Sequence, residues 1–220
     1  MKIVRKTFLI PILLLILFSL SYSLTRTKIS SNRNPLINIK KYIPDAVIDM
    51  RYSTKNNFMK TVLDGYKKNY CMVKPKTALA LRRVYEYLKK HGYGLKFFDC
   101  YRPLRAVKHM IRWTKKNHPK WLGVYVGSRV NLNVKFGHSS GNTIDLTLID
   151  LKTGKAVNMG TEFDDFRKIA WTKNAGGKIL RNRMILFNAM KKFGFENFYS
   201  EWWHYSYKND PGMPMDFVIK

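Results

Sequence analysis

Two pairs of side chains in the second half of the chain could hold a metal ion. His138 stands seven residues before Asp145, which lies inside the segment TIDLTL, although strand interiors are usually poor in aspartate. Glu201 and His204 lie in EWWHY, among aromatic residues where an acid or imidazole without partners is costly to bury. Two imidazoles and one carboxylate suit zinc, and a further carboxylate could take a proton from an attacking water. The set predicts metal-assisted hydrolysis, and the alternative is two unrelated polar pairs.

The spacing of three between Glu201 and His204 constrains the structure around them. On a helix the two side chains would share a face, whereas on a regular strand they would point to opposite faces. The aromatic segment 202–207 favours a strand. Glu201 must then lie in the turn before that strand, or a bulge must separate the two residues.

The segments around these residues predict a single α+β domain. Apolar residues at helical spacing, with proline or glycine at the ends, predict helices over 77–90, 103–114 and 179–193. Runs rich in β-branched and aromatic residues predict strands or extended segments over 36–39, 47–52, 94–100, 143–150 and 202–207. Because this order lacks regular βαβ alternation, we expect a central antiparallel sheet flanked by helices.

The N-terminus has the pattern of an export signal. A basic start with Lys2, Arg5 and Lys6 precedes an apolar run over 8–20 and small residues over 21–23. An uncleaved membrane anchor is the alternative, although the apolar run is short for a span. Both interpretations place the rest of the chain in the periplasm or cell envelope.

This pattern also divides the chain. We predict a signal peptide over 1–23, a basic N-terminal segment over 24–42 and the main domain over 43–220. Contact with the membrane is expected only if the signal stays uncleaved.

The charge of the chain is strongly basic. The sequence has 41 Lys and Arg against 14 Asp and Glu, a net charge of +27. Such a charge favours anionic partners such as a wall polymer, but lysines spread along a chain are also typical of an ordinary solvated surface. No nucleic-acid-binding motif accompanies the charge, so we expect no specific nucleic-acid partner.

The cysteine content is low. Cys71 and Cys100 could pair in an exported protein, or they could be two buried small residues. They are too few for a cysteine-based zinc site.

Motifs dispersed along the chain resemble a known family. They are DMRYSTKNNF (49–58), DGY (64–66), FDCYRP (98–103), HSSGNTIDLTL (138–148), MGTEFD (159–164) and EWWHY (201–205). With them, the chain from about Asp49 onward resembles the zinc D-alanyl-D-alanine dipeptidases of the VanX type, relatives of the D-Ala-D-Ala carboxypeptidases and of hedgehog-like domains. The resemblance implies one zinc ion on an antiparallel sheet and hydrolysis of D-Ala-D-Ala to D-alanine.

The resemblance also implies a role for individual residues. They are the zinc ligands His138, Asp145 and His204, the catalytic base Glu201, the transition-state arginine Arg102, and the substrate-binding residues Tyr52, Tyr66 and Asp164.

Structural roles stay open for some of these residues. Arg102 could pair with Asp99 and hold the turn, the two tyrosines could belong to the core, and Asp164 could stabilise a helix start.

Two features depart from the family pattern. Phe136 stands where the family usually has a serine that contacts substrate, which predicts weaker capture of a free C-terminal carboxylate. The export signal suits processing or recycling of wall peptides. Phe136 and the basic surface favour one alternative enzyme, a D,D- or L,D-carboxypeptidase that trims peptidoglycan stems. A non-catalytic wall-binding domain is disfavoured, because Glu201, Arg102 and the ligand set are complete.

Overall fold

The computed structural model describes residues 34–126 and 137–220, and the compact unit within them starts at Leu36. In these stretches the chain forms the helices α2 (Pro75–Lys89), α3 (Leu104–Asn117) and α4 (Gly177–Lys192). The main sheet contains β2 (Val47–Ile48), β4 (Tyr93–Asp99), β5 (Thr143–Asp150), β7 (His204–Tyr207) and β6 (Phe195–Asn197), in that order. A two-stranded sheet pairs β1 (Ile37–Asn38) with β3 (Met72–Val73).

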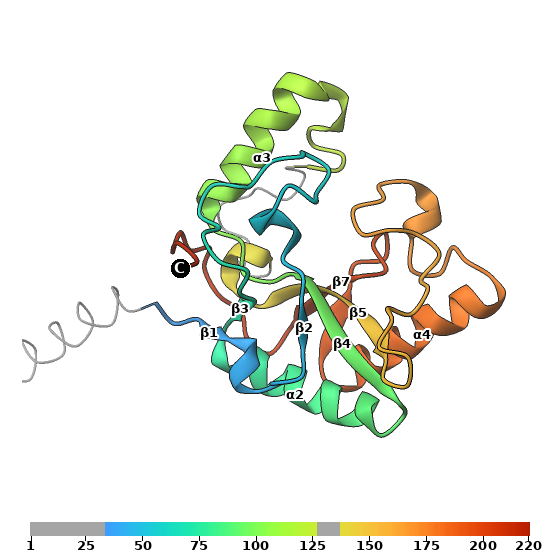
Figure 1. Ribbon diagram of the computed structural model, residues 1–220. Helices are drawn as coiled ribbons and strands as arrows, with labels where there is room; N and C mark the ends of the chain where they lie inside the picture. Colours follow the sequence, from blue (N-terminus) through green and yellow to red (C-terminus); the bar gives the residue numbers. More distant parts are fainter. Residues whose placement is uncertain (1–33, 127–136) are drawn as a thin grey trace, which may run out of the picture. The chain divides into compact units, whose positions relative to one another are not determined.

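The sheet is antiparallel from β4 through β5 and β7 to β6, and β2 joins β4 at the edge as a parallel strand. Helix α2 packs on β4 and on α4, and α4 packs on β6, whereas α3 stands away from them at the top of the view (Figure 1). Antiparallel pairs and helices that do not alternate with parallel strands define an α+β domain. The predicted fold class is confirmed, with one parallel edge strand added.

Helix α2 shows how the sequence pattern produces this packing. Ala78, Leu81, Val84 and Leu88 recur every three or four residues and are all at most 1% exposed, so one face of the helix enters the core. The helix begins at Pro75, two residues before the predicted start, because proline suits the first helical turn.

The other two predicted helices also form, with shifted ends. Pro103 is the N-cap residue of α3 and lies just before its first helical residue. The helix continues to Asn117. Helix α4 begins at Gly177 and ends at Lys192, just before Gly194, whose φ of 88° favours glycine.

Residues 36–42, assigned to the basic N-terminal segment from the sequence, are part of the folded unit. Leu36 and Ile39 are buried, and the Ile39 amide donates a hydrogen bond of 2.9 Å to the Cys71 carbonyl. The compact unit therefore begins at Leu36 rather than at residue 43. The predicted signal peptide over 1–23 lies outside the described residues.

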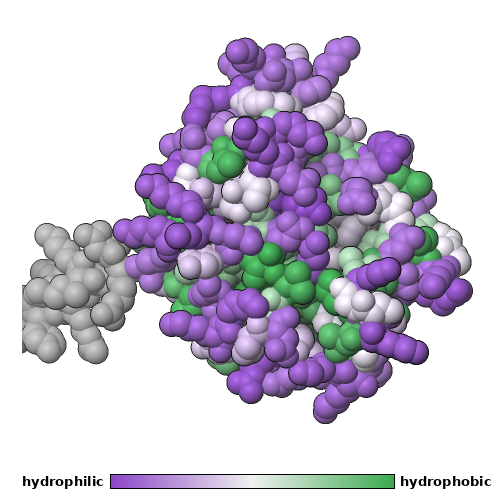
Figure 2. Space-filling view, in the orientation of Figure 1, coloured by the Kyte–Doolittle hydropathy of each residue, from purple (hydrophilic) through white to green (hydrophobic). Residues whose placement is uncertain are grey.

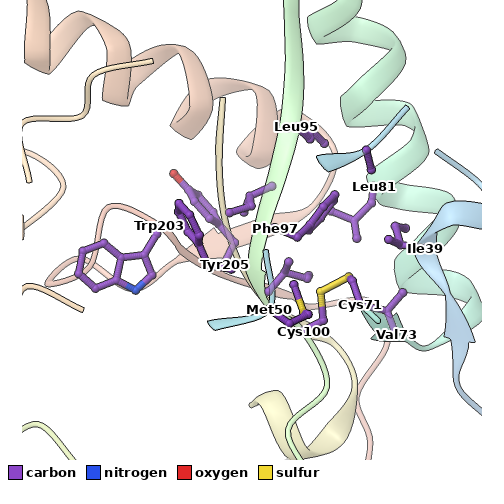
Figure 3. Close-up of a cluster of buried hydrophobic side chains, with 14 of the residues drawn as sticks. Ile39, Met50, Cys71, Val73, Leu81, Leu95, Phe97, Cys100, Trp203 and Tyr205 are labelled. Carbon is purple, nitrogen blue, oxygen red and sulfur yellow. A yellow bond between two sulfur atoms is a disulfide. The ribbon is translucent and has the colours of Figure 1, made fainter. Parts of the chain in front are cut away.

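The two cysteines form a disulfide, a point that the sequence left open. Cys71 and Cys100 are both fully buried, and their sulfur atoms are bonded beside Met50 and Val73 (Figure 3). The bond links the residue just before β3 to the segment that follows β4.

The surface is hydrophilic over most of the face in Figure 2, with small apolar patches between. No lysine among the described residues is buried, whereas Arg183 is buried and donates hydrogen bonds to the carbonyls of Met159, Ile169 and Trp171. Along the described part of the chain, no helix has both the length and the apolar character that a membrane span needs.

Candidate active site

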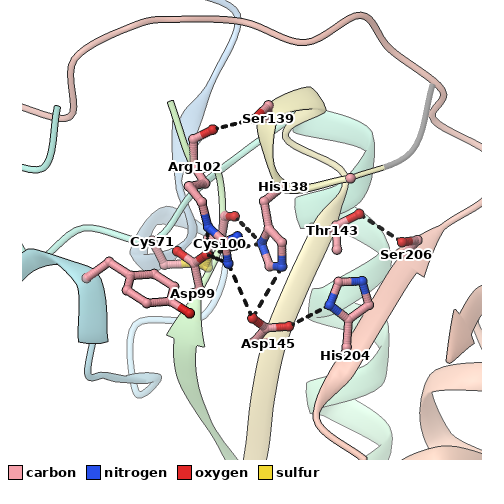
Figure 4. Close-up of polar contacts among 12 residues, drawn as sticks. Cys71, Asp99, Cys100, Arg102, His138, Ser139, Thr143, Asp145, His204 and Ser206 are labelled. Atoms are coloured by element: carbon pink, nitrogen blue, oxygen red, sulfur yellow. Dashed lines mark hydrogen bonds and ion pairs between the residues drawn. A yellow bond between two sulfur atoms is a disulfide. The ribbon is translucent and has the colours of Figure 1, made fainter. Parts of the chain in front are cut away.

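Strand pairing brings the predicted metal ligands together. Asp145 on β5 lies directly opposite His204 on β7 in the antiparallel register. His138 opens the short 3-10 helix η4 (His138–Ser140), and Gly141 then turns the chain into β5 with a φ of 72°. This turn explains the spacing of seven, because it folds His138 back over the strand that carries Asp145 (Figure 4).

The three side chains form a compact cluster. Nε2 of His138 lies 3.2 Å from Oδ2 of Asp145, and Nδ1 of His204 lies 3.0 Å from Oδ1 of Asp145. One ligand atom from each residue falls within 4.8 Å of the others. These contacts are ion pairs by distance, but the buried atoms His138 Nε2 and Asp145 Oδ1 make no hydrogen bond of good geometry with the described residues. A cation bound between two imidazole nitrogens and one carboxylate would satisfy both atoms, so the donor set fits a divalent metal.

The charges in this cluster are coupled. Burial alone would raise the pKa of Asp145, but the imidazoles of His138 and His204 lower it well below its usual range. Burial lowers the pKa of His138, but the carboxylates of Asp145 and Asp99 raise it. The pKa of His138 is therefore raised overall. Asp145 is therefore an ionised carboxylate at neutral pH and provides the negative charge that a cation requires.

A backbone group orients the first imidazole. Nδ1 of His138 donates a hydrogen bond of 2.7 Å to the Cys100 carbonyl, and Oδ2 of Asp99 lies 3.3 Å from the same nitrogen. Because a carbonyl can only accept, Nδ1 carries a hydrogen, and Nε2 is left as the ring nitrogen that faces Asp145 and could bind a metal. The sequence did not reveal the role of Cys100, since a backbone carbonyl leaves no mark on residue type.

Glu201 lies in the turn before β7, which is one of the two arrangements that its spacing allowed. The strand begins at His204, and Oε2 of Glu201 lies 3.4 Å from Nδ1 of His204. The Asn197 side chain holds this turn by donating hydrogen bonds of 3.0 Å to the carbonyls of Glu201 and His204. Asn197 was not predicted, because its partners become neighbours only when β6 pairs with β7.

Arg102 pairs with Asp99 and also faces the cluster. Its Nε and Nη2 atoms lie 2.9 Å and 2.7 Å from Oδ2 of Asp99, and Nη2 lies 4.0 Å from Oδ2 of Asp145. Burial opposes the charged form, but Asp99 and its neighbours raise the pKa of Arg102, so the guanidinium stays charged. Arg102 therefore pairs with Asp99, as the structural interpretation predicted, and its charged group also lies at the edge of the site.

The three residues predicted to bind substrate lie in different places. The Tyr52 hydroxyl donates hydrogen bonds to the Asp164 carboxylate at 3.0 and 3.1 Å, and both residues line the cavity. Burial raises the pKa of Asp164, and the Asp145 carboxylate raises it further. Tyr66 is buried behind the site, where its hydroxyl donates to Oδ1 of Asp99 at 2.6 Å. Tyr66 is not one of the described residues that line the cavity.

A cavity of about 680 Å³ joins these groups. His138, Asp145, Glu201 and His204 line it together with Arg102, Tyr52 and Asp164.

Aromatic rings form a further wall of the same cavity. Phe166 stacks on Tyr125 with ring centres 5.2 Å apart and meets the edge of Phe58 at 5.4 Å. The sequence did not indicate this wall, because its rings come from distant segments. Phe136 lies outside the described residues.

Comparisons of the sequence with known proteins identify a family of dipeptidases. A family model described as D-ala-D-ala dipeptidase, Peptidase_M15, matches residues 32–218. A D-alanyl-D-alanine dipeptidase of Enterococcus faecalis is 35% identical over 174 residues, which cover 74% of this chain and 86% of that protein. One from Enterococcus faecium is 34% identical over 185 residues, covering 78% and 92%. One from Escherichia coli is 27% identical over 187 residues, covering 84% and 91%.

Proposed function

The chain belongs to the Peptidase_M15 family of D-Ala-D-Ala dipeptidases, and from this premise we propose that it is a zinc-dependent hydrolase that splits D-alanyl-D-alanine into two molecules of D-alanine. The observation that carries the proposal is the cluster of His138, Asp145 and His204 in one cavity with Glu201. Metal-assisted hydrolysis requires metal ligands and a proton acceptor that lie close to one another.

His138, Asp145 and His204 would hold the ion. Two imidazole nitrogens with one carboxylate favour zinc over calcium or magnesium, which prefer sets of oxygen ligands. When bound, zinc supplies Lewis-acid chemistry: it polarises the peptide carbonyl and makes water a stronger acid.

The remaining steps use side chains of this protein. Glu201 would accept a proton from the attacking water and pass it to the leaving amine. Its carboxylate lies beside the ligand cluster without being part of it, which supports this role. Arg102 stabilises the negative charge that develops on the carbonyl oxygen, since Asp99 fixes its guanidinium at the edge of the site.

Asp164 would bind the free amine of the dipeptide. A buried carboxylate needs a cationic partner to stay charged, and the substrate ammonium is such a partner. Tyr52 holds the carboxylate in place through its hydroxyl. The backbone of Asp164 has a φ of 63°, so the chain accepts an uncommon conformation at this position.

Replacing Asp164 with asparagine should raise KM for D-Ala-D-Ala by about 10- to 100-fold, because a hydrogen bond to a charged group contributes roughly 1.5–3 kcal/mol. The loss should be absent for N-acetyl-D-Ala-D-Ala, which has no ammonium group. Steady-state kinetics on both substrates tests this. Asp165→Asn is the matched control, since Asp165 pairs with Arg167 instead. Equal KM changes in the two variants would show that Asp164 does not bind the amine.

The aromatic wall favours one alternative substrate class. A cavity of about 680 Å³ is within the range that holds drug-sized ligands, and Phe58, Tyr125 and Phe166 could pack on a longer peptide. A D,D- or L,D-carboxypeptidase that trims peptidoglycan stems would use this space. The two functions separate in one assay, because a carboxypeptidase would turn over a pentapeptide stem faster than the dipeptide.

We also propose that the protein is exported and acts in the periplasm or cell envelope. The basic and apolar N-terminal pattern supports this proposal, as does the Cys71–Cys100 disulfide, because disulfides persist in oxidising compartments. The mature chain should begin near Leu24, and N-terminal sequencing of protein from an export-competent host checks it. An intact Met1 in the membrane fraction would indicate an anchor.

A further inference from the structure

We propose that the Cys71–Cys100 disulfide is a positioning element of the metal site. It holds the Cys100 carbonyl against the His138 imidazole, and the oxidised protein therefore binds zinc more tightly than the reduced protein. The inference rests on the proposed metal centre and adds that its zinc affinity depends on the oxidation state of the two cysteines.

The cysteine lies within a short segment that carries several contacts of the site. Residues 100–103 follow β4 and precede α3 without regular secondary structure. Cys100 offers its carbonyl to Nδ1 of His138 at 2.7 Å, and Asp99 just before it lies 3.3 Å from the same nitrogen. Arg102 extends from the same segment toward Asp145 (Figure 4). A shift of this backbone would therefore move three groups of the site together.

The segment is anchored on the side away from the cavity. The disulfide ties Cys100 to Cys71, and the Tyr101 amide donates a hydrogen bond of 2.8 Å to the Met72 carbonyl. Cys71 is held in turn, because its carbonyl accepts from the Ile39 amide at 2.9 Å. The covalent link thus acts on the very residue whose carbonyl orients His138.

Orientation of His138 decides whether Nε2 is available as a ligand. The Cys100 carbonyl keeps a hydrogen on Nδ1 and turns Nε2 toward Asp145, where that nitrogen could bind a metal. If the carbonyl moves, the ring can rotate and the other tautomer becomes accessible. Loss of such a supporting contact typically weakens metal affinity by about 10- to 100-fold.

Reduction of the disulfide would remove this constraint on the Cys100 carbonyl. A dithiol gives two electrons and two protons to the disulfide, which becomes two thiols while the dithiol is oxidised to its own disulfide. The released Cys100 is then held by hydrogen bonds of its neighbours, among them the Tyr101 amide to the Met72 carbonyl and the Ser139 hydroxyl to the Arg102 carbonyl, and no longer by a covalent bond. Because both cysteines are fully buried, reduction requires local opening of the segment, and an oxidising compartment keeps the site assembled.

The test compares zinc affinity in the wild type, in Cys71→Ala/Cys100→Ala and in Leu88→Ala. Leu88 is a buried residue of α2, a helix that carries none of the site residues, so its variant controls for lost stability alone. Competition with a chelator gives the zinc Kd, urea unfolding gives the stability, and the absorption spectrum of bound Co²⁺ reports ligand geometry.

We expect the double cysteine variant to bind zinc about 10- to 100-fold more weakly, with a changed Co²⁺ spectrum, while Leu88→Ala binds like the wild type. If the double variant does not fold, reduced wild-type protein, freed of reductant, takes its place. Unchanged affinity without the disulfide, or an equal loss in Leu88→Ala, would overturn the inference. Failure of the oxidised wild type to bind zinc would overturn the metal centre itself.

Discussion

Replacing Glu201 with glutamine is expected to lower kcat for D-Ala-D-Ala by at least about 100-fold, while zinc binding stays at the wild-type level. Glutamine has nearly the same shape but cannot accept the proton of the attacking water. Zinc should remain because the ligand cluster consists of His138, Asp145 and His204. KM should change little, since Glu201 acts on the reaction rather than on the ends of the dipeptide.

Glu196→Gln is the matched control for this prediction. Glu196 lies on the neighbouring strand β6 and pairs with Lys208, so the same chemical change there should leave kcat unaltered. Steady-state kinetics and elemental analysis of both variants give the answer. A wild-type kcat in Glu201→Gln would mean that another group is the base, and loss of zinc would mean that Glu201 is a ligand.

Long elements of the fold could be predicted because each has a strong periodic pattern of its own. The predicted strand over 143–150 forms as β5 with the same bounds, and helix α2 differs from its prediction by two residues at the start and one at the end. Short elements were harder to predict from the sequence. Strand β2 contains two residues, and its parallel pairing depends on β4, which lies more than forty positions further along the chain.

The site could be predicted in part, for a similar reason. An acid within a strand and an acid beside a histidine among aromatic rings are local anomalies, and they pointed to Asp145 and to Glu201 with His204. The supporting groups carry no local signal. Asp99 accepts a hydrogen bond from Tyr66, and the Cys100 carbonyl accepts one from His138, through contacts between segments distant in sequence. Only the local pairing of Arg102 with Asp99, three residues away, was an interpretation that the sequence allowed.

The same reasoning applies to the disulfide. Cys71 and Cys100 are 29 residues apart, and only the approach of β3 to the end of β4 places them in bonding distance. Two cysteines in isolation support pairing and burial equally well, so the choice required the structure.

Replacing both His138 and His204 with alanine should remove zinc and activity together. Zinc held by four protein ligands binds with about 10–16 kcal/mol, so each ligand accounts for roughly 3 kcal/mol, and losing two weakens binding on the order of 10⁴-fold. Asp145 alone would remain, and one carboxylate does not retain zinc against water. His109→Ala/His118→Ala is the matched control, because neither histidine belongs to the ligand cluster.

The most direct measurement is the release of D-alanine from D-Ala-D-Ala by samples whose zinc content is known from elemental analysis. We expect one zinc ion per chain and rapid release in the wild type and in the His109→Ala/His118→Ala control, loss of both after treatment with a chelator, and recovery when zinc is added back. The His138→Ala/His204→Ala variant should contain no zinc and release no D-alanine. Wild-type zinc content and D-alanine release in that variant would contradict the assignment of the metal site and of the catalysis that depends on it.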